Sequence, residues 1–174
     1  MTPADTVRSS RHYEAALEGF LKDHQTPYVA LDETRRVIFA GARLKSFDFL
    51  IYPSSGAKLI VDVKGRKFPY TSGSTRRYWE NWISRADLDG LTQWQSAFGE
   101  GYRAALVFAY WLSGPPERWP AGPVHTHDEQ LYVFLYSDIA EYARHARQRS
   151  GKWDTVSVPG KAFRQMVHPL ADLL

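Results

Sequence analysis

The hydrophobic pattern predicts a helix near the start of the chain. One apolar stripe recurs at helical spacing through Tyr13, Ala16, Leu17, Phe20 and Leu21. Ser9 or Ser10 can cap this helix, and it should end before Thr26-Pro27 because proline disfavours helical backbone in the residue before it. The segment Met1–Ser10 shows no such periodicity, so we expect a flexible leader there.

Three apolar runs after this helix predict strands. They are Tyr28–Leu31, which can resume at Val37–Ala40, then Phe47–Tyr52, and then Leu59–Val63. The segment Pro53–Gly56 has the length and composition of a hairpin turn, so the second and third runs should pair antiparallel. The basic, glycine-containing segment Gly65–Arg77 predicts a loop.

The second half of the chain predicts buried strands between helices. Helical spacing recurs over Asp87–Phe98, while Ala104–Leu112 and Gln130–Tyr136 are almost wholly apolar, as strands covered on both faces are. A further helix is predicted from Asp138 to Arg149, and a short strand at Thr155–Val158. This order of elements predicts an α/β sandwich around a mixed central sheet.

The composition favours one globular domain, which we expect over residues 11–174. The 174 residues are 44% hydrophobic, which is enough for one core. The lack of cysteine excludes disulfides, thiolate nucleophiles and cysteine-based metal sites. No apolar run approaches the roughly 18 residues of a membrane span, and no secretory leader opens the chain, so we expect a cytoplasmic protein without a membrane partner.

Basic charge is concentrated in two blocks of the sequence. Arg35–Arg77 holds ten Lys or Arg against two acids, and Tyr142–Gln165 holds six against one, although the whole chain carries only +3. Between them, Tyr78–Glu141 has three basic and nine acidic residues. Such segregation suits an anionic partner such as nucleic acid, and two solvated basic edges explain it equally well.

The only two acids of the first basic block interrupt predicted strands. Asp48 and Asp62 each stand in a run of core-type side chains, where a carboxylate is rare unless it is paired or metal-bound. Lys64 shares a strand face with Asp62. If the hairpin register sets the two carboxylates side by side, a hard cation such as Mg²⁺ would compensate them. For an isolated Asp-x-Lys, an ordinary strand end at the surface is the simpler interpretation.

The wider constellation resembles the PD-(D/E)XK nuclease superfamily. Members carry a glutamate on the first helix, an acid on the second core strand, Asp/Glu-x-Lys on the third and often a glutamine on the next helix. The matching residues here are Glu14, Asp48, Asp62, Lys64 and either Gln93 or Gln95. Phe47 stands where the superfamily's name has proline. The resemblance covers residues 11–112 and leaves 113–174 as a C-terminal extension.

This resemblance implies a fold and an activity. The fold is restriction endonuclease-like, a three-layer α/β/α sandwich with a mixed central sheet flanked by helices. The activity is hydrolysis of phosphodiester bonds in nucleic acid, with DNA as the first expectation, by an endo- or exonuclease that uses Mg²⁺ or Mn²⁺. A catalytically inactive nucleic-acid-binding module of the same fold is the alternative.

The same resemblance implies the roles of individual residues. Asp48, Asp62 and the carbonyl of Val63 would bind the metal, Lys64 would position the attacking water, and Glu14 would orient water or bind a second ion. Three further residues are accessory candidates: Glu18, four positions from Glu14 on one helix face, and Gln93 and Gln95. Solvated or structural roles remain open for all three and for Glu14.

The first helix is also similar to that of uncharacterised bacterial proteins known by a HYExAFE signature. The sequence reads His12-Tyr13-Glu14-Ala15-Ala16-Leu17-Glu18, with Leu17 in place of the phenylalanine. The signature names a motif and implies no activity.

Aromatic residues interleave with the basic ones after Lys64. The candidates for binding phosphates and bases are Arg66, Lys67, Tyr70, Arg76, Arg77 and Trp79. Core packing explains Tyr70 and Trp79 equally well.

The alternation in His125-Thr126-His127 places two imidazoles on one face, but a third zinc ligand at structural spacing is missing, so polar surface is the simpler interpretation. The sequence leaves open whether the chain is a monomer or a homodimer.

Overall fold

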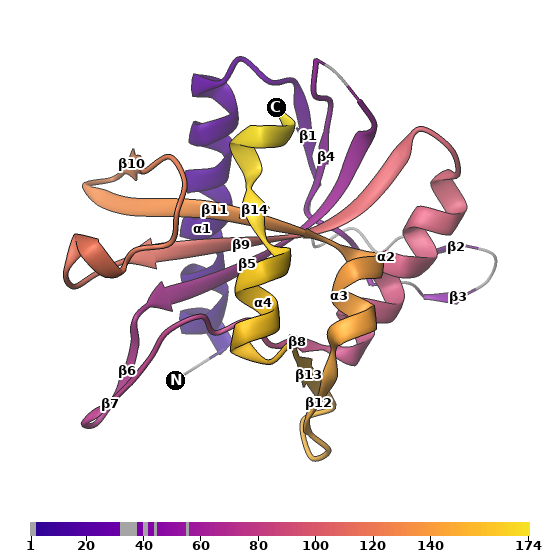
Figure 1. Cartoon of the computed structure of the whole chain (residues 1–174). Helices are drawn as coiled ribbons and strands as arrows, with labels where there is room; N and C mark the ends of the chain where they lie inside the picture. Colours follow the sequence, from indigo (N-terminus) through magenta and orange to yellow (C-terminus); the bar gives the residue numbers. More distant parts are fainter. Residues whose placement is uncertain (1–2, 32–37, 40–41, 44, 55) are drawn as a thin grey trace.

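A mixed sheet forms the middle layer of the computed structural model, which describes residues 3–31, 38–39, 42–43, 45–54 and 56–174 (Figure 1). Its strands are β1 (Tyr28–Ala30), β4 (Phe49–Ile51), β5 (Lys58–Phe68), β9 (Tyr102–Leu112), β10 (His125–His127), β11 (Gln130–Asp138) and β14 (His168–Pro169). They lie in the order β1-β4-β5-β9-β11-β10, with β14 beside β11. The long strands β5 and β9 run parallel, and the other pairings between these strands are antiparallel.

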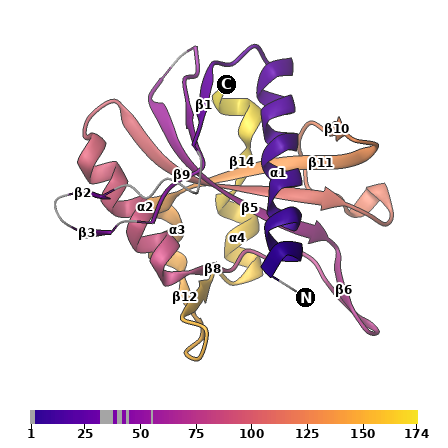
Figure 2. The ribbon, with the colours of Figure 1, turned by 180° about the vertical axis from the view of Figure 1, so that it is seen from behind.

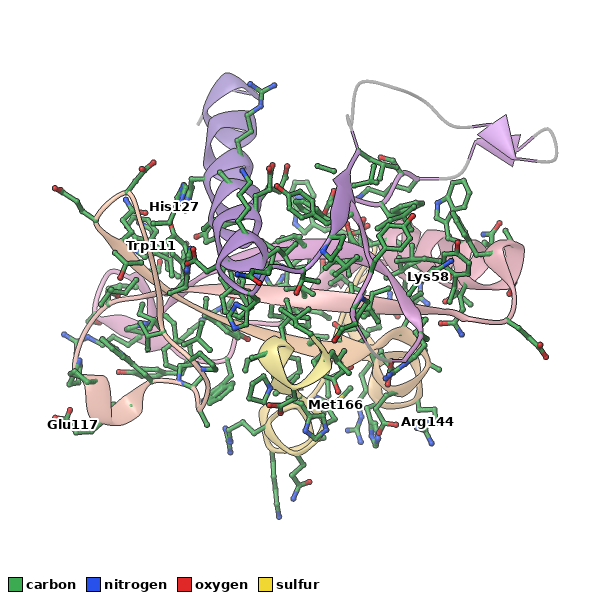
Figure 3. The ribbon with its side chains drawn as sticks, turned by 90° about the horizontal axis from the view of Figure 1, so that it is seen from above. Lys58, Trp111, Glu117, His127, Arg144 and Met166 are labelled. Carbon is green, nitrogen blue, oxygen red and sulfur yellow. The ribbon has the colours of Figure 1, made fainter. Side chains whose placement is uncertain are left out.

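Helices cover both faces of this sheet (Figures 1 and 2). Helix α1 (Pro3–Asp23) lies on one face, and helices α2 (Arg85–Phe98), α3 (Ile139–His145) and α4 (Gly160–Met166) lie on the other. Side chains fill the space between each helical layer and the sheet (Figure 3). The result is a three-layer α/β/α sandwich.

The alternation of side chains along β5 explains the two cores. Leu59 and Val61 pack with the apolar stripe of α1, whereas Ile60 and Phe68 pack with α2 and its neighbours. Successive side chains of a strand point to opposite faces, so an apolar residue at nearly every position indicates a strand buried on both sides. Asp62, Lys64 and Arg66 stand at the same alternate positions as Ile60 and Phe68, so their side chains leave the face covered by α2.

Smaller elements surround the central sheet. Two hairpins are formed by β2 (Ile38–Phe39) with β3 (Ala42–Arg43), and by β6 (Tyr70–Ser72) with β7 (Thr75–Arg77). A three-stranded sheet consists of β8 (Ile83–Ser84), β12 (Arg147–Ser150) and β13 (Thr155–Ser157). Two short 3-10 helices lie at Pro116–Arg118 and Leu170–Leu173. No helix of the described residues is both long and apolar enough to cross a membrane.

Several predicted elements are confirmed. The hairpin between the second and third runs is antiparallel, with Leu50 opposite Ile60. The predicted buried strands correspond to β9 and β11, and the helix over Asp87–Phe98 to α2. The first helix ends at Asp23, before Thr26-Pro27, as the proline requires.

Other predictions at the start and middle of the chain are wrong. Helix α1 already begins at Pro3, inside the segment expected to be a flexible leader. The segment Gly65–Arg77 is no loop, because β5 continues to Phe68 beside β9 and the rest forms the β6–β7 hairpin. The basic residues Arg66 and Lys67 are typical of a loop, but their backbone pairs with β9 as the rest of β5 does. Of Val37–Ala40, only residues 38–39 are described, and they pair with β3 rather than extending β1.

The C-terminal part also differs from its prediction. Helix α3 ends at His145, and residues 147–150 form β12. Asp138 occupies the N-cap position of α3 as predicted, but its side chain makes no capping hydrogen bond and its carboxylate binds Arg103 at 2.7 Å instead. Helix α4 was not predicted. Residues after 112 supply β10, β11 and β14 to the central sheet, so this segment is integral to the fold.

Candidate active site

The pairing of β4 with β5 brings Asp48 to the middle of β5. The Asp48 amide donates to the Val61 carbonyl at 2.8 Å, and the Val63 amide donates to Asp48 Oδ2 at 2.6 Å. Asp48 and Asp62 are each only 7% exposed. The backbone thus fixes the Asp48 carboxylate beside the segment Asp62–Lys64.

Lys64 lies between two buried carboxylates. Its Nζ is 2.6 Å from Asp62 Oδ2 and 3.1 Å from Asp87 Oδ2. Asp62 and Lys64 are two residues apart in one strand, so their side chains leave the same face, toward α2. This ammonium is held from two sides, with little freedom to turn away.

Asp87 joins the site from the first turn of α2, and the sequence analysis did not assign it a functional role. Its backbone amide donates to Ser84 Oγ at 3.0 Å, and its Oδ2 accepts from the Ser84 amide at 3.1 Å. This reciprocal capping box fixes the carboxylate, which also forms an ion pair with Lys45. The spacing Ser84-x-x-Asp87 was a signal that could have marked the helix start and this side chain.

The charges of this cluster perturb one another strongly. Burial, and then the charge of Asp62, raise the pKa of Asp48 to about 8. Burial also raises the pKa of Asp62, against the opposing effect of Lys64. Burial disfavours the charged form of Lys64, but Asp62 and Asp87 outweigh it and raise its pKa. Burial likewise opposes ionisation of Asp87, yet Lys64 and Lys45 lower its pKa to about 2.

The donor set fits a hard divalent cation. Asp48 and Asp62 supply carboxylate oxygens, and burial together with the neighbouring charge of Asp62 makes the ionised form of Asp48 unfavourable unless a cation joins it. Within the described part of the chain, no three or more His, Asp or Glu side chains gather closely enough to hold an ion. The protein share would therefore be these two carboxylates and a backbone carbonyl, with water completing the shell, as Mg²⁺ prefers.

Glu14 and its neighbours fix α1 against β5. Glu14 is half-buried, and its charge contributes to the raised pKa of Asp48. The ring of Tyr13 lies directly on Gly65, where an added Cβ would come within 2.1 Å of Tyr13 Cδ2. The side chain of His12 is held by a 2.8 Å hydrogen bond to the hydroxyl of Tyr132. The contact between Tyr13 and Gly65 requires glycine after the Asp-x-Lys motif.

The accessory candidates are engaged elsewhere or lie in solvent. Glu18 accepts a hydrogen bond from the Tyr28 hydroxyl at 2.8 Å. Gln95 accepts one from the Ala104 amide at 2.8 Å, which ties α2 to the start of β9. Gln93 is exposed on α2. These contacts are structural, and they give no support to a catalytic role.

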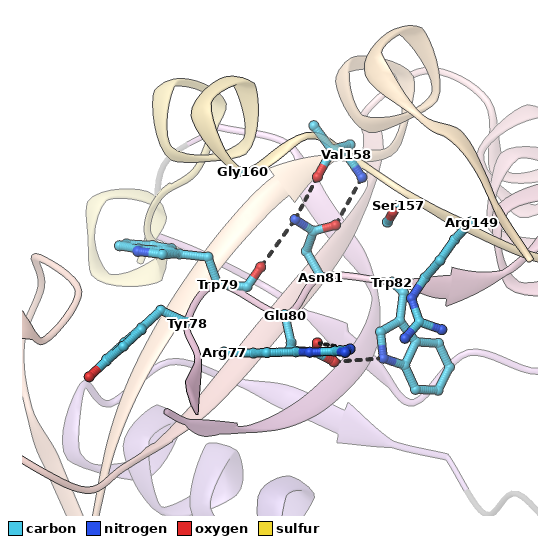
Figure 4. A pocket seen from close by; sticks show the side chains of 10 residues that line it. All are labelled: Arg77, Tyr78, Trp79, Glu80, Asn81, Trp82, Arg149, Ser157, Val158 and Gly160. Atoms are coloured by element: carbon cyan, nitrogen blue, oxygen red, sulfur yellow. Dashed lines mark hydrogen bonds and ion pairs between the residues drawn. The ribbon is translucent and has the colours of Figure 1, made fainter. Parts of the chain in front are cut away.

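Beyond Lys64, β5 runs along a cavity of about 650 Å³, here named the cationic pocket. Its basic lining residues are Arg66, Lys67, Arg77 and Arg149, and its other walls include Tyr70, Glu80 and Trp82. A neighbouring cavity of about 290 Å³ shares Arg77, Glu80, Trp82 and Arg149 with it (Figure 4). The Trp82 indole donates to Glu80 at 3.1 Å, and Arg77 lies 3.8 Å from the same carboxylate.

Two of the predicted nucleic-acid-binding residues lie outside the cationic pocket. Trp79 packs edge-on against Phe68, Tyr110 and Phe163, so core packing accounts for its ring. Arg76 is exposed on β7 but does not line the cavity. Trp82 and Arg149 do line it, although no sequence signal linked residues so far apart.

The two imidazoles of the His-x-His segment share a face of β10, with ring centroids 6.5 Å apart. His125 Nδ1 lies 3.3 Å from Asp23, and its ring packs on Phe20 of α1. Burial lowers the pKa of His125. These contacts of His125 join β10 to α1.

Comparisons with known proteins identify a fold. No protein-family model matches the chain, and no curated protein has a matching sequence. Among solved structures, the chain is similar to Hjc, a Holliday junction resolvase from the archaeal hyperthermophile Archaeoglobus fulgidus. The TM-score is 0.53 at 11% identity, covering 92% of this chain and 95% of that chain. The fold is restriction endonuclease-like.

This nuclease-like fold agrees with the predicted sandwich and mixed sheet. At such low identity the likeness extends to the fold alone. Membership of the family with the HYExAFE signature stays a prediction, because no family model matches. The roles of the site residues also stay predictions, because a likeness of fold at this identity tests no single residue.

Proposed function

We propose that this protein is a metal-dependent nuclease that hydrolyses phosphodiester bonds in DNA. The hydrogen bond from the Val63 amide to Asp48 carries the proposal, because it fixes one carboxylate beside Asp62 and Lys64. Two neighbouring carboxylates with a clamped ammonium, in a resolvase-like fold, support hydrolysis assisted by Mg²⁺ or Mn²⁺.

In this proposal, Asp48, Asp62 and the Val63 carbonyl hold the metal. When bound, the ion polarises a phosphoryl oxygen and acidifies a bound water. Lys64 holds the attacking water through its ammonium, and Asp87 keeps that ammonium in place from the opposite side. Glu14 orients a water at the edge of the site. The enzyme would act in the cytoplasm, as an endo- or exonuclease.

The second candidate is a binding module of the same fold that has lost catalysis. One observation favours it: Lys64 is already paired with two carboxylates, an arrangement that a purely structural network would also show. Such a module would bind DNA with a steep salt dependence and show no turnover with metal.

A cleavage assay separates the two candidates. The substrates are single-stranded, duplex and branched DNA and single-stranded RNA, each with Mg²⁺, Mn²⁺ or EDTA. Branched DNA is included because the structurally similar protein is a Holliday junction resolvase. We expect cleavage of at least one DNA substrate with metal and none with EDTA.

Two lysine variants on the same strand make the assay specific. Lys64→Ala should lower the rate at least about 100-fold, as loss of a proton-transfer or water-positioning group does. Lys58→Ala removes a lysine that packs over Tyr52 and Tyr102 at the far end of β5, and it should cut normally. Cleavage of none of the substrates, or equal rates for Lys64→Ala and the parent, would sink the catalytic proposal.

A further inference from the structure

The cationic pocket contains more positive charge than its own acids balance. Among the described residues, Arg66, Lys67 and Arg149 have no carboxylate within 4.0 Å, and only Arg77 is near one, Glu80 at 3.8 Å. Arg85, Arg103 and Arg144, by contrast, each lie against a carboxylate, as Arg103 does against Asp138 at 2.7 Å. Four cations facing one carboxylate in a cavity call for an anion from outside.

Arg66 is the strongest case, because its side chain is partly buried and its guanidinium is held in place. It donates to the Gly65 carbonyl at 2.7 Å and to the Trp82 carbonyl, and it lies 4.4 Å from the centre of the Trp82 ring. Burial lowers its pKa. Buried charges are normally paired with an opposite charge. The direct contacts of Arg66 are neutral carbonyls and a ring, and Glu80 acts on its charge without forming an ion pair with it. The missing negative charge can come from a ligand.

The position of the pocket connects it to the catalytic cluster. Arg66 follows Lys64 by two residues on the same face of β5, which is about 6.6 Å along an extended strand. A ligand in the pocket would therefore lie next to whatever group Lys64 contacts. A nucleic-acid strand with its scissile phosphate at Lys64 would bring its neighbouring nucleotide here.

We propose that the cationic pocket binds an unpaired nucleotide adjacent to the scissile phosphate, so the substrate carries a single-stranded segment at the cleavage site. This inference rests on the proposed function. Arg149 and Lys67 neutralise the phosphate, and the rings of Tyr70 and Trp82 contact the base.

The shape and chemistry of the pocket favour an unpaired base over a duplex. A cavity of about 650 Å³ matches the size that encloses a small molecule, whereas a paired base is hidden within its stack. Tyr70 is 44% exposed at the cavity wall and can stack with any base. Ser72 and Glu80 add hydrogen-bonding groups that can reach the exposed edge of an unpaired base.

Binding measured in EDTA tests this inference without catalysis. The probes are fluorescein-labelled oligothymidylate and the duplex of the same length, and the readout is fluorescence anisotropy. We expect the single strand to bind at least about tenfold more tightly than the duplex. Tyr70→Ala should weaken single-strand binding about tenfold and leave duplex binding unchanged, since stacking on aromatic rings contributes that much per base. Tyr70→Phe keeps the ring and should bind as the parent does.

Two arginines of one strand provide a second, matched test. Arg149→Ala should weaken single-strand binding and reduce the slope of log affinity against log salt by about 0.7, the value for one phosphate contact in a single strand. Arg147→Ala removes an exposed arginine of the same strand that does not line the pocket, so slope and affinity should stay unchanged. Thermal melting confirms that each variant is folded.

The outcomes test the pocket inference and the proposed nuclease function separately. Equal affinity for both probes, or single-strand affinity unchanged in both Tyr70→Ala and Arg149→Ala, would overturn the pocket inference even if the protein cuts duplex DNA. The expected losses in EDTA without cleavage in Mg²⁺ or Mn²⁺ would support the pocket and remove the proposed nuclease function.

Discussion

The two halves of β5 differ in how their charges are balanced. Around Asp62 and Lys64, each lysine lies against a carboxylate, and Asp87 links Lys64 to Lys45. Around Arg66, the described residues supply hardly any acids to match the cations. In the first half Lys45 and Lys64 are paired while Asp48 is not, whereas in the second half the cations outnumber the acids.

The difference predicts how each half contributes to the molecule. A buried, mutually paired network is costly to break, because removal of one partner leaves the other charge buried and unpaired. An unpaired cationic surface contributes little to folding but makes binding of a polyanion sensitive to salt. Variants in the first half should change stability or catalysis, and variants in the second half should change binding.

The largest stability effect should come from Asp87→Ala. This change removes the capping carboxylate and one of two partners of Lys64, and breaking a buried ion pair in this way costs about 3–5 kcal/mol. The free energy of unfolding in urea at neutral pH measures it. Asp89→Ala, an exposed acid on the same helix, should change stability by less than about 0.5 kcal/mol.

The pH dependence of the same pair gives an independent check. The pKa of Asp87 falls from its usual 3.8 to about 2 on folding, so its stabilising contribution is present above pH 3.8 and is lost as pH falls toward 2. The stability difference between the parent and Asp87→Ala should therefore shrink across this interval. A difference that stays constant down to pH 2 would contradict the ion-pair assignment.

A smaller effect of opposite sign is expected for Asp48→Asn. The pKa of Asp48 is raised from 3.8 to about 8, so the folded state favours its protonated form and loses stability as pH rises between these values. Without metal, the variant should be more stable than the parent at pH 8, by about 1 kcal/mol or more, and the gain should vanish near pH 4. Urea unfolding at both pH values measures this, and a variant less stable than the parent at pH 8 would refute it.

The smallest effect distinguishes unpaired from paired cations in single-strand binding. Lys67→Ala should lower the salt slope of single-stranded DNA affinity by about 0.7, because its ammonium lies over the Trp111 ring without an acidic partner among the described residues. Arg103→Ala removes a cation already bound to Asp138 and should leave the slope unchanged. Equal slopes for the two variants would remove the contrast between the two halves of β5.

The sequence predicted most of the fold because the strongest signals are local. The stripe through Tyr13, the hairpin before Leu59 and the apolar run of β9 each appear within a short window. The extension of β5 to Phe68 was missed because Arg66 and Lys67 look like loop residues. Only the pairing of their backbone with β9 reveals the strand.

The candidate site was predictable only in part, for a related reason. Asp48, Asp62 and Lys64 stood out as polar interruptions of strands, and the register then placed them together. Asp87 and Arg149 come from distant elements, and their contribution depends on how α2 and β12 pack against β5. Tertiary contacts of that kind leave no periodic signal in a single sequence.

Metal binding by the carboxylate pair is the central claim, and calorimetric titration with Mn²⁺ tests it most directly. The parent should show saturable binding, and Asp48→Asn should lose it, because that change removes one of two carboxylate ligands. Asp89→Asn serves as the matched control on an exposed acid and should bind as the parent does. Saturable binding of equal affinity in the parent and Asp48→Asn would contradict the account.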